Sequence, residues 1–512
     1  MANSYLCAVK NTTFVVSDLT SVIKMSPEAI IITLVVYLAL LFLLARRVAR
    51  RADNATFFIG GRRTTWYAAT LAMIGAAMSG VTFISVPGSV AADSFSYMQM
   101  VVGFTIGQLI VAFILVPTFY RRGVVSLYEW LEIRFGQTTH RTGAWCFLVA
   151  KVIGAALKIY VVCSVMQILV WDHFNIDFTI NLLLTLLVVW LYTRTGGVRS
   201  LIATDILQSL CLVASIAVCI WLICREMGFS FTAATEAIVE SPYSQMWFFD
   251  DAASPRYFWK MVAGGALCLV AMTGLDQDMM QRNMSCRTMR DSQINIVLTA
   301  LCQAVVILLF LSLGALIYRY IDFAAIPMPA RGDDAFALVA VQGGLPLLAG
   351  IMFVIGLISS TYSAAGASLT SLTTAFTIDV LDGRKRYDEP TLTRLRHRTH
   401  IAMAAILFIV VMIFERLASD SIINLVFKVA GYTYGPILGM FVFGLISKRG
   451  VSERAMPVIA ILSPIASYAL QCIVAEQFAY QIGFELLGYN ALFTILGMML
   501  VSRRQNTPNT NP

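Results

Sequence analysis

The chain has 512 residues, of which 58% are hydrophobic and 13% charged, and its mean hydropathy is +0.77. Water-soluble domains do not have this balance. The composition therefore argues against a soluble enzyme, a nucleic-acid binder or a secreted disulfide scaffold, and it indicates a protein embedded in a lipid bilayer. The net charge of +8 does not indicate nucleic acid as a partner, because the arginines and lysines cluster beside apolar segments, as the positive-inside rule expects.

Apolar stretches bounded by charged residues predict about thirteen membrane-spanning helices, since a span needs about 20 mostly apolar residues. The predicted spans are 28–46, 66–93, 95–119, 140–168, 178–194, 200–224, 258–281, 292–320, 347–380, 399–415, 420–447, 453–474 and 483–502. The loops that follow the odd-numbered spans carry most of the arginine and lysine. This alternation predicts a multi-pass protein of the plasma (inner) membrane, with its N-terminus outside and its C-terminus in the cytoplasm.

The same segmentation predicts six parts of the chain. They are an outer N-terminus with an extra first helix (1–65), a first repeat (66–225), an extracellular loop (226–257), a second repeat (258–449), two C-terminal helices (450–504) and a disordered polar tail (505–512). The outer loops 226–257 and 322–345 are each long enough for a short surface helix. Such a helix is either a lid over the protein or a simple connector.

Two of the predicted spans contain helix-breaking residues. Gly80, Pro87 and Gly88 interrupt the second span, and Gly265 and Gly274 lie in the seventh. In membrane transporters, a helix is interrupted where unwound backbone lines a binding cavity. The two spans are five apart, which is the offset expected for inverted repeats. The alternative is that these glycines only allow neighbouring helices to pack closely.

The ninth span is unusually rich in hydroxyl groups between Ser359 and Thr377. Ser359 and Ser363 lie four residues apart and share one face of a helix. Hydroxyl and carbonyl oxygens suit a hard cation such as sodium, and polar groups inside a membrane commonly mark an ion or substrate path. The alternative is hydrogen bonding between packed helices.

Five segments, taken in chain order, resemble motifs of the sodium/solute symporter family. They are WYAATLAMIGAAMSGVTFISVPG (66–88), SLYEWLEIRFG (126–136), YTRTGGVRSLIATDILQ (192–208), GLDQDMMQR (274–282) and FTID (376–379). The resemblance implies an all-α, polytopic membrane protein with the leucine-transporter fold. In this fold two inverted five-helix repeats form the core, and here one extra helix precedes it and two follow. It also implies a carrier and not an enzyme, in which sodium entering the cell drives solute import by alternating access.

The resemblance also implies a sodium site shared across the family. It assigns backbone carbonyls of Gly75 and Met78, the carbonyl of Ser360 and the hydroxyl of Ser363 as sodium ligands. A second hydroxyl of the family site falls on Ala364, which has none. The site is then weaker, or shifted by one turn of the helix, or the carrier is driven by another ion.

Some relatives have a second sodium site built around an aspartate, which Asp205 matches. The serines of that second site fall on Gly366 and Ala367, so we expect one coupling ion. Asp205 then either tunes the first site or pairs with a nearby cation.

Three lysines fall inside predicted spans, where a charge is costly and tends to mark a pathway or an ion pair. Lys151 and Lys158 lie about two turns apart on one face of the fourth span, and Lys428 lies in the eleventh. Lys158 is interpreted as a contact for an anionic solute, because sialic acid carriers of the family place an arginine on this helix. Alternatively it replaces a cation near the depleted sodium site or pairs with Asp205. Lys151 is alternatively a residue that reaches the membrane interface.

The predicted function is sodium-coupled import of a small organic anion, such as sialic acid or another carboxylate, by a monomer. The predicted solute contacts are Ser79, Thr82, Ser85, Tyr97, Gln99, Lys158 and Met272. Two alternatives stay open. One is a proton-coupled carrier of a sugar or another neutral solute, using Asp205 and Lys158, and the other is a sensor or channel that kept this fold without transport.

Overall fold

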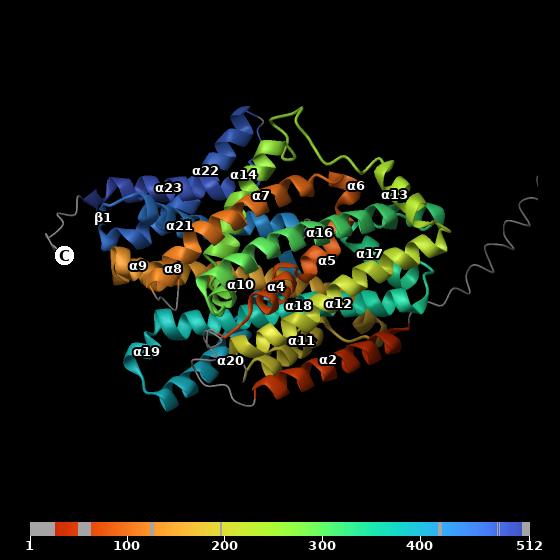
Figure 1. Ribbon diagram of the computed structural model, residues 1–512, viewed down its shortest axis with the longest axis horizontal. Coiled ribbons are helices and arrows are strands. Elements are labelled where there is room, and N and C mark those ends of the chain that lie inside the picture. The colour runs from red at the N-terminus through yellow and green to blue at the C-terminus, as the bar shows by residue number, and fades with distance from the viewer. Residues whose placement is uncertain are drawn as a thin grey trace, which may run out of the picture.

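A computed structural model describes residues 26–49, 63–122, 127–194, 197–417, 422–478, 480 and 482–503. These residues form helices almost throughout, together with one two-stranded antiparallel ladder that pairs Gly450 with Arg503 and Val451 with Ser502. Most helices run along the long axis of the molecule, with α9, α19 and β1 at one end and α13 at the other (Figure 1). The first end carries the loops that we predict to be cytoplasmic, and the second is called the predicted outer side.

The first half of the described chain contains α2 (Pro27–Ala49), α4 (Trp66–Ala77), α5 (Gly80–Gly88), α6 (Val90–Asp93), α7 (Tyr97–Ile110), η3 (Val111–Leu115), α8 (Val116–Arg122), α9 (Leu127–Phe135), α10 (Gln137–Met166), η4 (Gln167–Trp171), η5 (Asp172–Phe174), α11 (Phe178–Thr193), α12 (Gly197–Glu226) and α13 (Phe231–Val239). The helix expected in the first outer loop is therefore present as α13.

The second half contains α14 (Phe258–Leu269), η6 (Val270–Gly274), α15 (Gln277–Met284), α16 (Met289–Phe323), η7 (Gly332–Asp334), α17 (Ala335–Ala337), η8 (Leu338–Gln342), α18 (Leu347–Ala375), η9 (Phe376–Val380), α19 (Gly383–Arg386), α20 (Glu389–Leu417), α21 (Ile422–Ile446), β1 (Gly450–Val451), η10 (Glu453–Ala455), α22 (Met456–Phe478), α23 (Leu486–Leu500) and β2 (Ser502–Arg503).

Each predicted span coincides with a helix, a run of joined helices or a bent helix pair in the described part of the chain. Nine stretches there are long and apolar enough to cross a membrane, two more are pairs bent at a short break, and α11 and α23 are shorter apolar helices. The span predicted at 399–415 is too short, because α20 begins ten residues earlier, at Glu389. The first turns of α20 carry arginines, which the hydropathy pattern assigned to a loop. Hydropathy detects only the apolar part of a span, whereas the helix can continue beyond the bilayer with charged residues.

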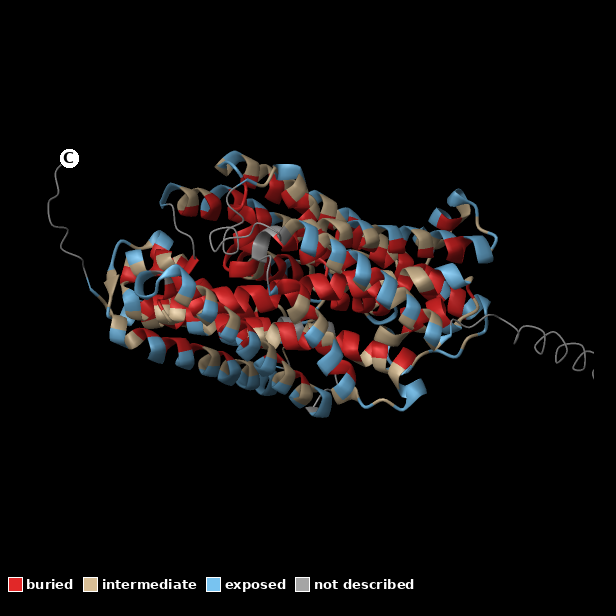
Figure 2. Ribbon diagram, turned by 90° about the horizontal axis from the view of Figure 1, so that it is seen from below, coloured by how far each residue is buried: buried red, intermediate tan, exposed pale blue. Residues whose placement is uncertain are grey.

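The helices pack in two groups around the central part of the chain. α7 packs against α14 and α16, and α16 packs against α4 and α5, whereas α10, α11, α18 and α20 pack against one another. α12 joins the groups, since it contacts both α4 and α18. Buried residues are concentrated in the central helices, and exposed residues follow the outward faces (Figure 2).

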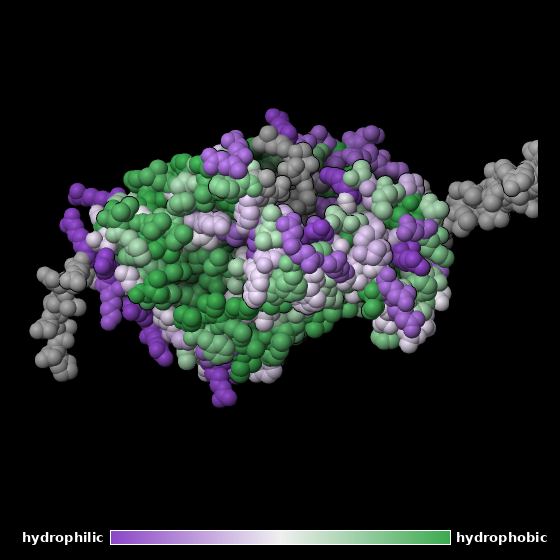
Figure 3. Space-filling view, turned by 90° about the horizontal axis from the view of Figure 1, so that it is seen from above, coloured by the Kyte–Doolittle hydropathy of each residue, from purple (hydrophilic) through white to green (hydrophobic). Residues whose placement is uncertain are grey.

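The outward-facing helix surfaces are apolar, as expected for a surface that meets lipid. On α2, for example, Ile32, Val36 and Leu43 are exposed to 64%, 64% and 68%. A broad hydrophobic area covers the left and lower middle of the surface in Figure 3, and hydrophilic residues lie toward both ends and in a patch between them. This distribution agrees with a multi-pass membrane protein.

Both predicted helix breaks are present. α4 and α5 meet at an angle of 60°, and α14–η6 meets α15 at 66°. Glycine at these positions therefore does more than allow close packing, because the helical path stops at both places.

Candidate functional site

The first break leaves backbone carbonyls without helical partners. α4 ends at Ala77, and Met78 has an extended backbone (φ −95°, ψ 95°). Ser79 precedes the first residue of α5, and its side chain makes no capping hydrogen bond. The last carbonyls of a helix have no donor one turn ahead, so the carbonyl of Gly75 in the last turn of α4 is available to a ligand.

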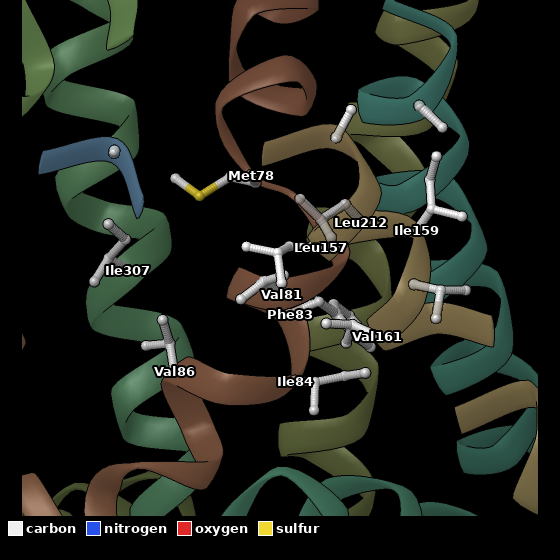
Figure 4. Packing of buried hydrophobic residues seen from close by; sticks show 14 of the residues in the cluster. Met78, Val81, Phe83, Ile84, Val86, Leu157, Ile159, Val161, Leu212 and Ile307 are labelled. Atoms are coloured by element: carbon white, nitrogen blue, oxygen red, sulfur yellow. The ribbon is translucent and has the colours of Figure 1, made fainter. Parts of the chain in front are cut away.

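Neighbouring helices hold this break closely. A Cβ atom added to Gly80 would collide with Thr361 Oγ1 of α18 and Val162 of α10, and one added to Gly75 would collide with Ser209 Oγ of α12. Figure 4 shows Met78 at the break, with Ile307 of α16 on one side and Leu157 of α10 on the other. Close approach of three helices explains why glycine stands on both sides of the break.

The α18 residues that are predicted to bind sodium are linked to the first break by α12. Ser363 Oγ donates a hydrogen bond to Asp205 Oδ1 at 2.6 Å, and the Asp205 carbonyl lies 3.1 Å from a Cβ built on Gly75. Ser360 is buried, and its hydroxyl donates to the carbonyl of Leu357 at 2.9 Å. The structure therefore brings Gly75, Asp205 and Ser363 together.

The second break is stabilised by charged side chains. Asp276 caps α15 by accepting a hydrogen bond from the backbone N–H of Asp278 at 2.9 Å. Lys151 Nζ of α10 lies 3.0 Å from both carboxylate oxygens of Asp276 and 3.1 Å from Asp278 Oδ2. The hydroxyl of Tyr434 on α21 also donates to Asp276, at 2.7 Å. Lys151 is thus an internal ion-pair partner and does not extend to a membrane interface.

Arg282 extends this network to α12. Its Nε and Nη2 atoms donate to Asp205 Oδ2 at 3.1 and 3.0 Å, and Nη1 pairs with Asp278. All three side chains are buried. The cation next to Asp205 is therefore Arg282, and the alternative pairing of Asp205 with Lys158 is wrong, because the guanidinium and Ser363 occupy this carboxylate.

Sequence reasoning did not identify this network as a unit. The four-residue spacing of Asp278 and Arg282 was a usable signal, since it predicts a pair on one helix face. The contribution of Tyr434 had no such signal, because it lies on a helix that only the tertiary structure brings to the break.

A central cavity of about 130 Å³ lies between the two breaks. Its walls come from α4, α5, α7, α10, α14, η6, α15, α16, α18 and α21. Its lining includes the polar and larger apolar side chains of Ser79, Thr82, Tyr97, Phe104, Lys151, Lys158, Met272, Thr273, Asp276, Gln303, Ser368 and Tyr434.

The structure places five predicted solute contacts on this cavity: Ser79, Thr82, Tyr97, Lys158 and Met272. Met78, a predicted sodium ligand, lies on it too. The other two predicted solute contacts, Ser85 and Gln99, do not lie on the cavity. Ser85 is fully buried away from the cavity, one turn of α5 beyond Thr82. Gln99 points to the outer loop, where it accepts from the backbone N–H of Phe248 and donates to the carbonyl of Arg256, both at 2.9 Å.

The two lysines of α10 differ in their partners. Lys151 has two carboxylates around it, whereas half-buried Lys158 forms no hydrogen bond or ion pair with any described residue. Both line the cavity. Of the two ammonium groups on the cavity, that of Lys158 is therefore the one without a partner among the described residues.

The chain is similar to known sodium-coupled transporters. A family model described as "Sodium:solute symporter family" matches residues 57–461. The sodium/iodide cotransporter of Homo sapiens is 25% identical over 413 residues, which are 78% of this chain and 62% of that protein. This chain therefore spans less than two thirds of that relative's length. The sodium/sialic acid symporter SiaT of Proteus mirabilis (strain HI4320) is 22% identical over 455 residues, covering 84% of this chain and 88% of that protein.

Among solved structures, the substrate-bound outward-open state of a Na+-coupled sialic acid symporter matches with a TM-score of 0.77 and 18% sequence identity. The match covers 93% of this chain and 99% of that one. At this identity the likeness concerns the fold, and it confirms the predicted class: an all-α, polytopic membrane protein with the leucine-transporter fold.

Proposed function

We propose that this chain, which belongs to the sodium:solute symporter family, is a sodium-coupled symporter that imports a small organic anion across the cell membrane. The single observation that carries the choice of an anion is Lys158, whose ammonium group lines the central cavity without a described partner. Two relatives, a sodium/iodide cotransporter and a sodium/sialic acid symporter, are by name carriers of anions.

The cavity supplies the remaining contacts that such a solute needs. Ser79 and Thr82 present hydroxyl groups at the start of α5, next to the break, and Phe104 and Met272 form apolar walls. An anion bound to Lys158 through its carboxylate would place its neutral part among these groups. A ligand site of this kind, mostly apolar with a few polar groups that fix orientation, is typical of proteins that bind small molecules.

Sodium is proposed to bind at the first break, through the carbonyls of Gly75, Met78 and Ser360 and the hydroxyl of Ser363. The nearby carboxylate of Asp205 contributes negative charge, and it stays tied to Arg282. Met78 and Ser79 are consecutive, so one short segment presents a carbonyl to the ion and a hydroxyl to the solute. Coupling follows if both ligands favour the same conformation of that segment, because each then raises the affinity for the other.

Uptake by proteoliposomes tests this proposal. Purified protein is reconstituted, and uptake of radiolabelled sialic acid, lactate, iodide, glucose and proline is measured under an inward sodium gradient, an inward proton gradient or neither. We expect uptake of at least one organic anion that depends on the sodium gradient. Uptake that follows only the proton gradient would overturn sodium coupling, and uptake restricted to neutral solutes would overturn the choice of an anion.

A further inference from the structure

A second, open cavity of about 530 Å³ lies on the predicted outer side. It forms where the α6–α7 segment, the loop before α14, the first part of α21 and the segment before α23 meet. Tyr97 lines both this cavity and the central one, and its ring packs edge-on against Phe104 with the centroids 6.2 Å apart. The two cavities are therefore neighbours separated by the Tyr97 side chain.

The lining of this second cavity, called the vestibule below, carries two cations and one carboxylate: Arg256, Lys428 and Asp93. Lys428 is exposed and forms no hydrogen bond or ion pair with any described residue. Arg256 lies over the ring of Phe248, 4.9 Å from its centroid, and Nη1 donates to the carbonyl of Ala92 at 3.4 Å. Neither cation forms an ion pair with Asp93 in the described part of the chain, so both retain capacity to bind an anion.

The apolar part of the lining favours an organic anion over an inorganic one. Met261 and Phe484 give the vestibule an apolar surface beside the cations, which suits the hydrocarbon part of a solute. The vestibule also meets the central cavity at Tyr97, and Lys158 lies on the far side. Lys428, whose position the sequence alone left unexplained, thus lies on the wall of the vestibule.

We propose that the vestibule is a capture site, where Lys428 and Arg256 bind a small organic anion before it passes Tyr97 into the central cavity. The inference rests on the proposed transport of an anion. A cleft in which one sign of charge prevails raises the local concentration of an oppositely charged ligand and its rate of entry. Because these charges are exposed to water, the effect weakens as salt screens them.

The test compares Lys428→Met with two controls in the reconstituted full-length protein. Lys428→Arg keeps the charge, and Arg225→Met removes an exposed cation at the end of α12, outside the vestibule. For the transported anion, we expect Lys428→Met to raise KM about three- to tenfold at low ionic strength with little change in kcat, as for removal of a steering charge. The difference should shrink at high salt, and both controls should keep the wild-type KM.

A binding measurement separates failure of this inference from failure of the proposed function. Equilibrium dialysis of radiolabelled sialic acid and lactate against the Lys158→Met protein in nanodiscs measures binding to the vestibule in the absence of transport. We expect weak binding that Lys428→Met, added to Lys158→Met, removes. Sodium-driven uptake with equal KM in wild type and Lys428→Met overturns the capture site alone. If no anion is transported, the proposed function fails. If, in addition, binding of the anions does not depend on Lys428, the capture site is overturned as well.

Discussion

The two interrupted helices have nearly the same bend, 60° and 66°, yet they differ in chemistry. The first break contains glycine, methionine and serine and has no charged residue of its own. The second begins at Asp276 and is tied to three other helices through Lys151, Arg282 and Tyr434. One geometry is therefore stabilised in two ways, by close packing in the first case and by ion pairs in the second.

This difference indicates different roles for the two breaks. At the first break the backbone carbonyl of Gly75 and the side chain of Ser79 keep hydrogen-bonding capacity that a bound ion or solute can use. At the second, the charged groups of Lys151, Asp276, Asp278 and Arg282 are already paired within the protein, and buried charges in that state stabilise one arrangement strongly. We therefore expect ligands to act on the first break and the second to resist change until its ion pairs rearrange.

The largest effect is expected from Lys151→Met, which leaves Asp276 without its cation. Breaking a buried ion pair by removing one partner costs about 3–5 kcal/mol, so Tm should fall clearly in thermal unfolding of the purified protein. Lys151→Met combined with Asp276→Asn removes both charges and should recover part of the loss. If the single variant unfolds at the wild-type temperature, the second break is not stabilised by charge.

Lys158→Met, on the same helix face, should affect transport and leave the stability of the protein nearly unchanged. Its ammonium has no described partner in the protein, so Tm should stay close to the wild-type value. We expect kcat/KM for the anionic solute to fall about 30-fold or more, because losing one partner of a buried charge pair costs about 2 kcal/mol or more. Initial uptake rates over a range of solute concentrations measure this. An unchanged kcat/KM would overturn the proposal that the solute is an anion.

Ser363→Ala tests the ion at the first break. The variant loses a hydroxyl beside Asp205, and we expect the sodium concentration for half-maximal uptake to rise about tenfold, as for a hydrogen bond to a charged group. Ser371→Ala is the matched control, since the Ser371 hydroxyl donates only to the Ser368 carbonyl of the same helix. Equal effects of the two substitutions would show that the chosen sodium ligands of α18 are wrong.

The smallest effect is expected from Gly80→Ala, which tests the close packing of the first break. The added methyl group would collide with Thr361 and Val162, and overpacking of this kind costs about 1–3 kcal/mol. Gly154→Ala on α10 is the control, because a Cβ there has nothing within 4 Å. Thermal unfolding of both variants should show a lower Tm for Gly80→Ala alone, and an equal Tm would contradict the proposed tight contact.

The arrangement of helices along the chain could be predicted because it depends on local pattern. Apolar stretches, loop cations and the residues around Gly80 and Gly274 were sufficient to place the spans and both breaks. Five predicted solute contacts lie on the central cavity, whereas Ser85 and Gln99 do not. These two lie near true lining residues in sequence, but the side of a helix that meets a cavity is set by its neighbours.

The sequence by itself determined that this chain folds within a membrane, where its helices lie and at which points two of them break, since hydropathy and backbone preference are properties of short segments. Only the tertiary structure decided the partners of the charged residues. Lys151, Lys158 and Lys428 all lie inside predicted spans, and the fold makes the first an ion-pair partner, the second a cavity residue and the third part of the vestibule. The energy of a buried charge depends on what surrounds it in space, and those neighbours come from helices far apart in the sequence.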